Sequence, residues 1–364
     1  MTEAIPDLVT GASGFIGRHL ARRLLAQGRR VRLLCRAPSV AKLDPAARAA
    51  AEVVEGDLRD AGSLRRAARG AGRIFHCAGH VSDWGQADEF VAANVAGTER
   101  LLDAARLERV GRFVHLSSIA VFGVPSPARF DDASPYGAGR DPYSRTKIAG
   151  EKAALRAHRE QGLAVTVLRP AVVYGPLGTW AEEPVAMMRQ GRMFLLGGGR
   201  GTCHPCYVEN LLDAMILAAD HPAALGNAYI VADDEPISFA EFFNHLARAA
   251  GQPPVRRSLP TPAARAVAIA LEATARLARA RARPLLTHAA IDMVTARSQM
   301  SMRKIRDELG FRPRYTVAAA MAEMTAWFTT GALPAARGEP GPAGGGGTPP
   351  GEGSDRQRDP VETK

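Results

Sequence analysis

The sequence has few of the features that mark a secreted or membrane-spanning protein. Its 364 residues include only four cysteines, too few and too far apart for a disulfide framework: Cys35, Cys77, Cys203 and Cys206. The N-terminal stretch "MTEAIPDLVTGASG" has no apolar signal run, and no segment reaches the roughly 18 apolar residues of a membrane span. We therefore expect a cytoplasmic protein in a reducing compartment.

Aromatic residues make up only 6% of the chain, so no series of rings is available to stack on nucleic-acid bases. The net charge is +10, but the arginines are scattered along the sequence. We expect no nucleic-acid partner. Cys203 and Cys206 form a C-x-x-C, yet no second pair of this kind exists to complete a zinc site. The sequence predicts no metal site.

The first half of the chain alternates short apolar runs with amphipathic segments. Strands are predicted at residues 7–10, 30–35, 52–55, 73–77, 112–117 and 164–169, with helices between them. Such alternation is typical of a parallel sheet with helices on both faces. The predicted class is therefore α/β, with a Rossmann-type, doubly wound, dinucleotide-binding domain over residues 1–170.

After residue 170 the pattern becomes mostly helical, with predicted helices at 207–220, 238–250, 262–283, 301–309 and 316–328. We expect a smaller substrate-binding lobe over residues 171–332, some elements of which can return to the main sheet. The helix at 262–283 has five arginines and one glutamate from 265 on. It fits a solvated helix packed on the lobe better than a peripheral membrane contact, which its composition also allows. Residues 333–364, rich in Gly and Pro, predict a disordered tail.

A glycine-rich loop follows the first predicted strand. In "VTGASGFIGRHL" the three glycines have the spacing G-x-x-G-x-x-G and open the first predicted helix. Glycines allow a sharp turn, a close approach of backbone N–H groups to a pyrophosphate, and tight helix–strand packing. The positive end of the helix then faces the phosphates. The loop predicts a dinucleotide site that contains Gly11, Ser13, Gly14, Phe15, Ile16 and Gly17.

The end of the second predicted strand bears on the choice of cofactor. Proteins that bind NAD usually have an acidic residue there, which accepts hydrogen bonds from the ribose hydroxyls. This chain has Arg36 instead, and no acidic residue before Asp44. A guanidinium suits the 2′-phosphate of NADP(H), with Lys42 as a second cation. The sequence thus favours NADP(H), while NAD(H) is possible if Arg36 only stacks on the adenine.

Seven short motifs together resemble the extended short-chain dehydrogenase/reductase superfamily over about residues 7–330. They are "TGASGFIG" (10–17), "GDL" (56–58), "HCAG" (76–79), "NVAGT" (94–98), "LSSIAVFG" (116–123), "YSRTK" (143–147) and "LRPAVVYGP" (168–176). The stretches "VSDWGQADEFVAANVAGT" and "KIRDELGFRP" are most similar to the 3β-hydroxysteroid dehydrogenase-like branch. The resemblance implies an NAD(P)-dependent enzyme and, as a possibility, a homodimer formed through helices at 88–107 and 143–160.

The resemblance also implies a catalytic set. Tyr143 matches the tyrosine that exchanges a proton with the substrate oxygen, and Lys147 matches the lysine that holds the nicotinamide ribose. Their i, i+4 spacing puts both on one helix face. Ser118 matches the serine that orients the substrate oxygen, with Ser117 as the neighbouring candidate, since only one of them should face the site. The charges of Lys147 and the nicotinamide are expected to lower the pKa of Tyr143.

The remaining matched positions surround the cofactor. The resemblance places Asp57 and Leu58 at the adenine, Ala78 and Gly79 beneath the adenosine ribose, and the backbone of Arg169, Pro170 and Val173 beside the nicotinamide. Asp83 and Trp84 follow the fourth predicted strand, where a substrate should enter. His76 and His115 lie within predicted strands and are expected to be core residues.

Two reaction classes remain open. The first is an oxidoreductase that interconverts a secondary alcohol and a ketone on a hydrophobic, steroid-like or polyketide-like molecule, with Tyr143 as proton donor or acceptor. The alternative is a nucleotide-sugar epimerase or dehydratase with tightly held NAD, whose substrate diphosphate would need Arg189, Arg192 or Arg200. "SSIAVFG" lacks the acidic pair of a dehydratase. A member of the fold without activity would usually lack the tyrosine or the lysine, and this chain has both.

Overall fold

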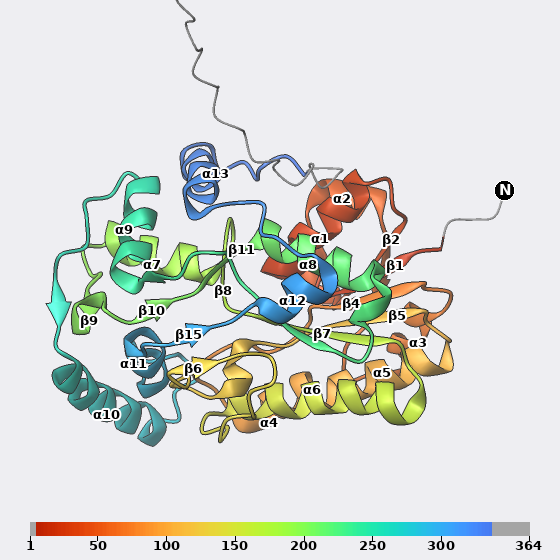
Figure 1. Cartoon of the computed structure of the whole chain (residues 1–364), viewed down its shortest axis with the longest axis horizontal. Helices are drawn as coiled ribbons and strands as arrows, with labels where there is room; N and C mark the ends of the chain where they lie inside the picture. Colours follow the sequence, from red (N-terminus) through yellow and green to blue (C-terminus); the bar gives the residue numbers. More distant parts are fainter. Residues whose placement is uncertain (1–4, 337–364) are drawn as a thin grey trace, which may run out of the picture.

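A parallel sheet of seven strands forms the centre of the structure, a computed structural model that describes residues 5–336 (Figure 1). In spatial order its strands are β12 (Ala228–Val231), β7 (Val165–Pro170), β5 (Arg112–Leu116), β4 (Arg73–His76), β1 (Asp7–Thr10), β2 (Val31–Cys35) and β3 (Glu52–Glu55). Every residue of β1, β7 and β12 is buried, as a sheet covered on both faces requires. The predicted doubly wound Rossmann-type fold is confirmed.

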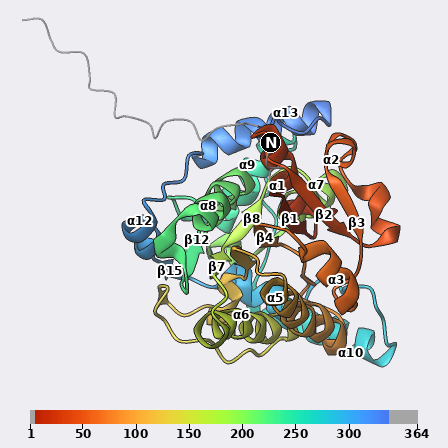
Figure 2. The ribbon, with the colours of Figure 1, turned by 90° about the vertical axis from the view of Figure 1, so that its right-hand side faces the viewer.

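Helices cover the two faces of this sheet in separate layers, which Figures 1 and 2 show on opposite sides. One layer contains α1 (Phe15–Ala26), α2 (Pro45–Ala50) and α8 (Val208–Asp220). The other contains α3 (Ala61–Ala68), α5 (Gly97–Leu107) and α6 (Pro142–Gln161), with α4 (Ala87–Phe90) and a π-helical turn (Val91–Ala96) leading into α5. The six strands predicted before residue 170 are all present, with their ends shifted by at most one residue.

The second half of the chain forms a group of helices at one end of the sheet, on the left of Figure 1. Its helices are α7 (Thr179–Arg189), α9 (Phe239–Ala249), α10 (Thr261–Leu277), α11 (His288–Thr295) and α13 (Val317–Thr330), while α12 (Arg303–Leu309) packs beside β12. Short strand pairs complete the fold: β6 (Arg129–Phe130) with β15 (Gln299–Met300), β8 (Val172–Tyr174) with β11 (Pro205–Tyr207), β9 (Leu195–Leu196) with β14 (Ser258–Leu259), and β10 (Thr202–Cys203) with β13 (Ile237–Ser238).

Two features of this half differ from the sequence-based expectations, and a third agrees with them. The helix expected at 262–283 ends at Leu277, and Arg279 adopts a left-handed backbone with φ of 48° that a helix cannot continue through. Helices α7 and α11 were not predicted, and Pro184 inside α7 is an unfavourable helix signal. Strand β12 becomes the edge strand of the main sheet, beside β7, and is an element of this half that returns to that sheet, as the sequence analysis allowed. Of the expected tail, residues 337–364 lie outside the described part.

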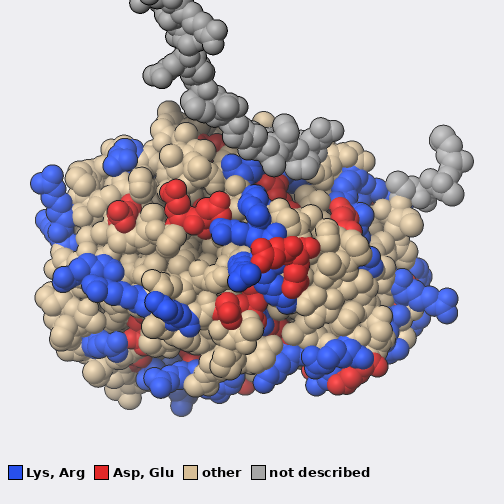
Figure 3. All heavy atoms as spheres, in the orientation of Figure 1, with Lys and Arg blue, Asp and Glu red and all other residues tan. Residues whose placement is uncertain are grey.

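The described residues show how charge is distributed on the surface and how apolar the helices are. Basic and acidic side chains are interspersed on the face that Figure 3 shows. None of the helices between residues 5 and 336 has the length and apolar character needed to cross a membrane.

A buried charge cluster fastens α1 to α8. The guanidinium of Arg23, only 1% exposed, pairs with the carboxylates of Glu209 and Asp213, with 2.7 Å between Nη1 and Asp213 Oδ1. Arg314 pairs with Asp213 at 3.1 Å, and His19 Nδ1 lies 3.5 Å from Glu209. Helix α1 is the helix that the glycine loop opens, so this cluster joins the predicted cofactor loop to the second half of the chain.

We expect Arg23→Met to lower the free energy of unfolding by about 3 kcal/mol, because it takes from two largely buried carboxylates the guanidinium that they share. Urea unfolding followed by circular dichroism measures this loss. Arg48→Met, at an exposed position of α2, is the matched control and should change stability by less than about 0.5 kcal/mol. Equal losses in the two variants would contradict a stabilising role for the cluster.

Candidate active site

The glycine loop lies between the end of β1 and the start of α1, packed against the segment after β4. Gly11 has a φ of +70°, and a Cβ there would lie 2.8 Å from the backbone nitrogen of Ala78. A Cβ on Gly17 would lie 2.3 Å from the carbonyl oxygen of Gly11. Both positions therefore require glycine, one for the turn and one for the close packing of helix on strand.

The first turn of α1 is open to an anion. No side chain caps it, and the turn contains no acidic residue. Its free N–H groups and the positive end of the helix dipole thus face the space beside the loop. These features fit the pyrophosphate of a dinucleotide, which Gly11, Ser13, Gly14 and the start of α1 would hold.

The residues predicted to contact the adenosine lie at the carboxyl ends of the neighbouring strands. Arg36 follows β2 and is exposed, and no hydrogen bond of its guanidinium is found within residues 5–336. Arg59 donates to the carboxylate of Asp57 at 3.1 and 3.0 Å, and this pairing lowers the pKa of Asp57. Leu58 packs against Gly97, and the backbone nitrogen of Ala78 donates to Thr10 Oγ1 at 3.2 Å. Arg36 is thus free to meet a phosphate.

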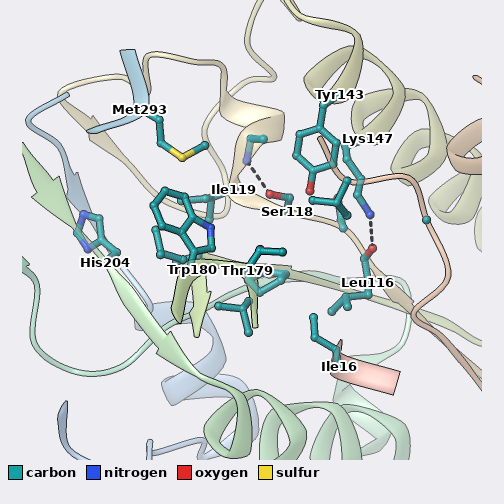
Figure 4. Close-up of a pocket in the computed structure, with 18 of the residues that line it drawn as sticks. Ile16, Leu116, Ser118, Ile119, Tyr143, Lys147, Thr179, Trp180, His204 and Met293 are labelled. Carbon is teal, nitrogen blue, oxygen red and sulfur yellow. Dashed lines mark hydrogen bonds between the residues drawn. The ribbon is translucent and has the colours of Figure 1, made fainter. Parts of the chain in front are cut away.

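A cavity of about 380 Å³ connects the glycine loop with the predicted catalytic residues (Figure 4). The residues that line it include most of the predicted cofactor and catalytic positions: Gly11, Gly14, Phe15, Ile16, Gly17, Gly79, Ser118, Tyr143, Lys147, Pro170 and Val173. Ser13, Arg36, Asp57, Leu58 and Ala78 do not line it. The structure therefore brings predicted cofactor-binding and catalytic residues, which come from five different segments of the chain, to the same cavity.

Helix α6 carries Tyr143 and Lys147 in its first two turns. Asp141 begins the helix as its N-cap, accepting from the backbone nitrogen of Ser144 at 2.8 Å and from its hydroxyl at 2.6 Å. Pro142 at the first helical position suits the fixed backbone angle there. The cap fixes the start of the helix at Pro142, and Tyr143 therefore lies in its first turn.

The three predicted catalytic side chains meet at the end of β5. The phenol of Tyr143 points toward the hydroxyl of Ser118 (Figure 4). Ser118 also accepts from the backbone nitrogen of Ala120 at 3.2 Å, and Lys147 Nζ donates to the carbonyl of Leu116 at 2.8 Å (Figure 4). Ser117 turns the other way, where its hydroxyl donates to Glu151 at 2.6 Å. Of the two serine candidates, Ser118 faces the cavity with Tyr143.

Glu151 holds the opposite side of this arrangement. Its side chain is fully buried and accepts from Arg169 Nε at 3.0 Å and from the hydroxyl of Tyr136 at 3.0 Å, besides Ser117. Arg169 therefore points away from the cavity, while the segment after it lines the cavity with Pro170 and Val173. One buried carboxylate thus joins α6 to the ends of β5 and β7.

Burial dominates the protonation of the catalytic pair. It raises the pKa of Tyr143 to about 12, against the lowering effect of the nearby Ser118 hydroxyl. Burial also lowers the pKa of Lys147 to about 8, which the Cys77 and Glu151 side chains partly oppose. The expected lowering of the Tyr143 pKa is wrong for the protein alone, because Nζ of Lys147 bonds to Leu116 and lies 6.0 Å from the centre of the phenol ring. Tyr143 is accordingly a phenol at neutral pH.

A second cavity, of about 310 Å³, opens from the far side of Tyr143 into the second lobe. Its wall is mostly apolar and comes from α7, α11 and the segments beside them: Trp180, Pro184, Met187, Met193, Phe194, Leu196, Phe243, Leu285, Leu286, Met293 and Val294. Val81, Val124, Tyr143, Thr179, Trp180 and Met293 line both cavities. Most of these apolar residues could not be assigned to the site from the sequence, because α7 and α11 were not predicted. The apolar spacing in "WAEEPVAMM" was the available signal.

The two residues predicted to meet a substrate are occupied by other contacts. Asp83 lines the second cavity, but its carboxylate accepts from Arg283 Nη2 at 2.8 Å and from the Thr287 hydroxyl at 2.5 Å. The indole nitrogen of Trp84 donates to the carbonyl of Ala280 at 3.2 Å, and Trp84 lines neither cavity.

Other residues singled out in the sequence are packed inside the protein. His76 and His115 are buried in β4 and β5, as expected, and burial lowers the pKa of both rings. Cys203 and Cys206 are buried free thiols, and burial raises their pKa well above the ordinary range. His204 lines the first cavity beyond Trp180, with Nε2 placed 3.1 Å from the carbonyl of Ser298 (Figure 4).

A dinucleotide cradle that opens onto a Ser–Tyr–Lys set defines a nicotinamide-dependent enzyme of the short-chain dehydrogenase/reductase type. Comparison with known families agrees: the NAD dependent epimerase/dehydratase family matches residues 8–232. The chain belongs to this family.

Individual relatives cover most of the chain. It is 32% identical over 355 residues to a 3 beta-hydroxysteroid dehydrogenase/Delta 5-->4-isomerase of Mycobacterium tuberculosis, covering 90% of this chain and 92% of that protein. It is 29% identical to a 2-alkyl-3-oxoalkanoate reductase of Stenotrophomonas maltophilia, covering 88% and 98%. Among solved structures, a dTDP-glucose 4,6-dehydratase of Streptomyces venezuelae with NAD bound superimposes with a TM-score of 0.71 at 26% identity, covering 89% and 97%.

The depressed pKa of Lys147 predicts a pH dependence of stability. Between about pH 8 and its ordinary value of 10.5, Lys147 is protonated in the unfolded chain and neutral in the folded one. The unfolded state then binds more protons, so stability rises with pH in this window. Relative to Lys147→Met, the wild-type free energy of unfolding should rise by about 2 kcal/mol from about pH 8 to about pH 10.

Urea unfolding at a series of pH values measures this difference. Lys152→Met, at an exposed position of the same helix, is the control and should run parallel to wild type. A flat difference between wild type and Lys147→Met across the window would show that the Lys147 pKa is not depressed.

Proposed function

We propose that the protein is an NADP(H)-dependent oxidoreductase that interconverts a ketone and a secondary alcohol on a hydrophobic small molecule. One observation carries the proposal: Tyr143 stands where the cavity at the glycine loop meets a second cavity with a mostly apolar wall. Arg283 is the one basic residue in that second wall, and its charge is paired with Asp83. The mostly apolar wall therefore suits a hydrophobic molecule.

The side chains divide the proton chemistry between them. In the direction of reduction, the phenol of Tyr143 would donate a proton to the carbonyl oxygen, and Ser118 would hold that oxygen by a second hydrogen bond. Lys147, which lines the same cavity one turn further along α6, would hold the ribose hydroxyls of the nicotinamide. The nicotinamide cofactor, when bound, supplies the hydride or accepts it. The apolar residues of the second cavity exclude water from the reacting oxygen and orient the rest of the substrate.

Two further observations support the choice of cofactor and substrate class. Arg36 is exposed after β2, at the position where an acidic residue would favour NAD, which supports NADP(H). The relatives from Mycobacterium tuberculosis and Stenotrophomonas maltophilia are named for a steroid and an alkylated oxoalkanoate, both largely hydrophobic molecules. These names support a steroid-like or long-chain ketone as the substrate.

The likeness to a dTDP-glucose dehydratase favours a nucleotide-sugar epimerase or dehydratase as the second candidate. Two features of the cavities argue against it. Arg189, Arg192 and Arg200, which a substrate diphosphate would need, are exposed and line neither cavity. The residues after Ser118 are Ile119 and Ala120, which supply no acidic pair.

The test of the reaction class compares wild type with Tyr143→Phe. Purified protein is mixed with NADPH and either hydrophobic 3-keto steroids and 2-alkyl-3-oxo acids or nucleotide sugars, and net NADPH oxidation and product formation are followed. We expect net oxidation with the hydrophobic ketones, and a loss of kcat by at least about a hundredfold in Tyr143→Phe, because the proton donor is absent.

The NADPH affinity of Tyr143→Phe should stay within about twofold of wild type, since the main cofactor contacts are elsewhere. Sugar conversion without net change in the cofactor would replace the proposal with the epimerase. Full activity of Tyr143→Phe would remove Tyr143 from the mechanism.

Arg36→Asp tests the cofactor. It should weaken NADPH binding by at least about tenfold, because it removes a charge-assisted bond and adds repulsion, and it should strengthen NADH binding. Fluorescence titration with each nucleotide gives the dissociation constants, with Arg48→Asp as the control. If wild type prefers NADH, or if Arg36→Asp lowers both affinities equally, the NADP(H) assignment is wrong.

A further inference from the structure

The outward surface of α10 is unusual for a helix that faces water. Ala264 and Ala268 turn inward and pack on Leu286 and Ile291. The exposed residues between Arg265 and Arg276 are all uncharged: Ala266, Val267, Ile269, Ala270, Ala273 and Thr274. A helix on a soluble protein normally presents charged or polar residues on this side. Between Arg265 and Arg276, the outer face of α10 therefore presents uncharged, mostly apolar side chains to its surroundings.

Exposed apolar side chains concentrate in this part of the molecule. Eight large hydrophobic residues are exposed within residues 5–336, and five of them belong to α10, the loop after it, or the loop that packs against it. These five are Val81, Val267, Ile269, Leu277 and Leu285, and Leu277 is 89% exposed. The loop containing Val81 is held there by the Trp84–Ala280 hydrogen bond and the Asp83–Arg283 ion pair. Figures 1 and 2 both place α10 at the outer edge of the molecule.

Positive charge lies at the end of this face. Arg279 and Arg281, two and four residues after Leu277, are exposed and form no ion pair within residues 5–336. Glu272, the one acidic residue of α10, is buried and bound to Arg276 at 2.9 Å and to the backbone nitrogen of His288 at 2.7 Å. The exposed surface of this segment therefore combines apolar side chains with unbalanced arginines and exposes no acidic group of α10.

We propose that α10 and the loop after it form a docking face for an anionic lipid bilayer, with Ile269 and Leu277 inserted among the lipids and Arg279 and Arg281 paired with lipid phosphates. A single convex helix suits shallow insertion into a bilayer interface. A second copy of this chain is a poorer occupant, because two such faces would bring like-charged arginines together. The inference does not depend on the reaction proposed above.

Docking in this orientation would bring the rim of the second cavity to the membrane. Leu285, half-exposed, and Val81 lie on that rim and belong to the same exposed apolar group. A molecule dissolved in the bilayer would then meet the cavity without first crossing water.

Vesicle co-sedimentation of the full chain tests the proposal, with phosphatidylcholine vesicles that contain or lack phosphatidylglycerol. We expect binding to the anionic vesicles that weakens with added salt. The double variant Ile269→Glu/Leu277→Glu should lose at least about tenfold in partition coefficient. Arg279→Gln and Arg281→Gln should each lose about fivefold on anionic vesicles. The matched control Val91→Glu/Leu107→Glu changes exposed apolar residues elsewhere and should bind as wild type.

Nucleotide binding and thermal unfolding of each variant verify that it is folded. Absence of the wild-type chain from both vesicle pellets would overturn the proposal, as would equal binding by the Ile269→Glu/Leu277→Glu variant. Light scattering that shows a dimer which this variant dissociates would also overturn it, and would assign the face to a second copy of the chain.

Discussion

The buried carboxylate of Glu151 is the contact on which the candidate site depends. A buried carboxylate needs an opposite charge and hydrogen-bond donors to offset its loss of water. Glu151 has them in the guanidinium of Arg169 and the hydroxyls of Ser117 and Tyr136. These partners come from β7, from the end of β5 and from the loop before α6. Because Glu151 lies one turn beyond Lys147, satisfying its carboxylate sets the rotation and height of α6. The positions of Tyr143 and Lys147 follow from that setting.

The cofactor side of the cavity rests on close backbone approach instead of charge. Gly11 and Gly17 let β1, α1 and the segment after β4 pack at distances that any side chain would prevent. The cluster around Arg23 then holds α1, the helix that begins at the glycine loop, against α8. Close backbone packing at Gly11 and Gly17 thus positions the cofactor end of the cavity, and the buried charge of Glu151 positions its catalytic end.

The second lobe adds an apolar surface to this polar centre. Inside, α7 and α11 provide the wall of the cavity beyond Tyr143. Burial raises the pKa of Tyr143 and lowers the pKa of Lys147. Outside, α10 carries uncharged residues away from the core. The rim residues Val81 and Leu285 connect the inner surface with the outer one. A hydrophobic substrate and a lipid surface are both consistent with this distribution.

The sequence by itself determined the elements whose signals are local. Alternating apolar runs specified the strands of the parallel sheet, glycine spacing specified the turn at Gly11, and the Tyr143–Lys147 spacing specified a shared helix face. Only the tertiary structure decided what depends on distant segments. Ser118 faces the cavity because the hydroxyl of Ser117 binds the buried Glu151. Asp83 is paired with Arg283, and the long helix ends at Leu277. The tertiary structure also set the pKa of Tyr143 and Lys147, because desolvation comes from residues that pack around a side chain and not from its neighbours in the chain.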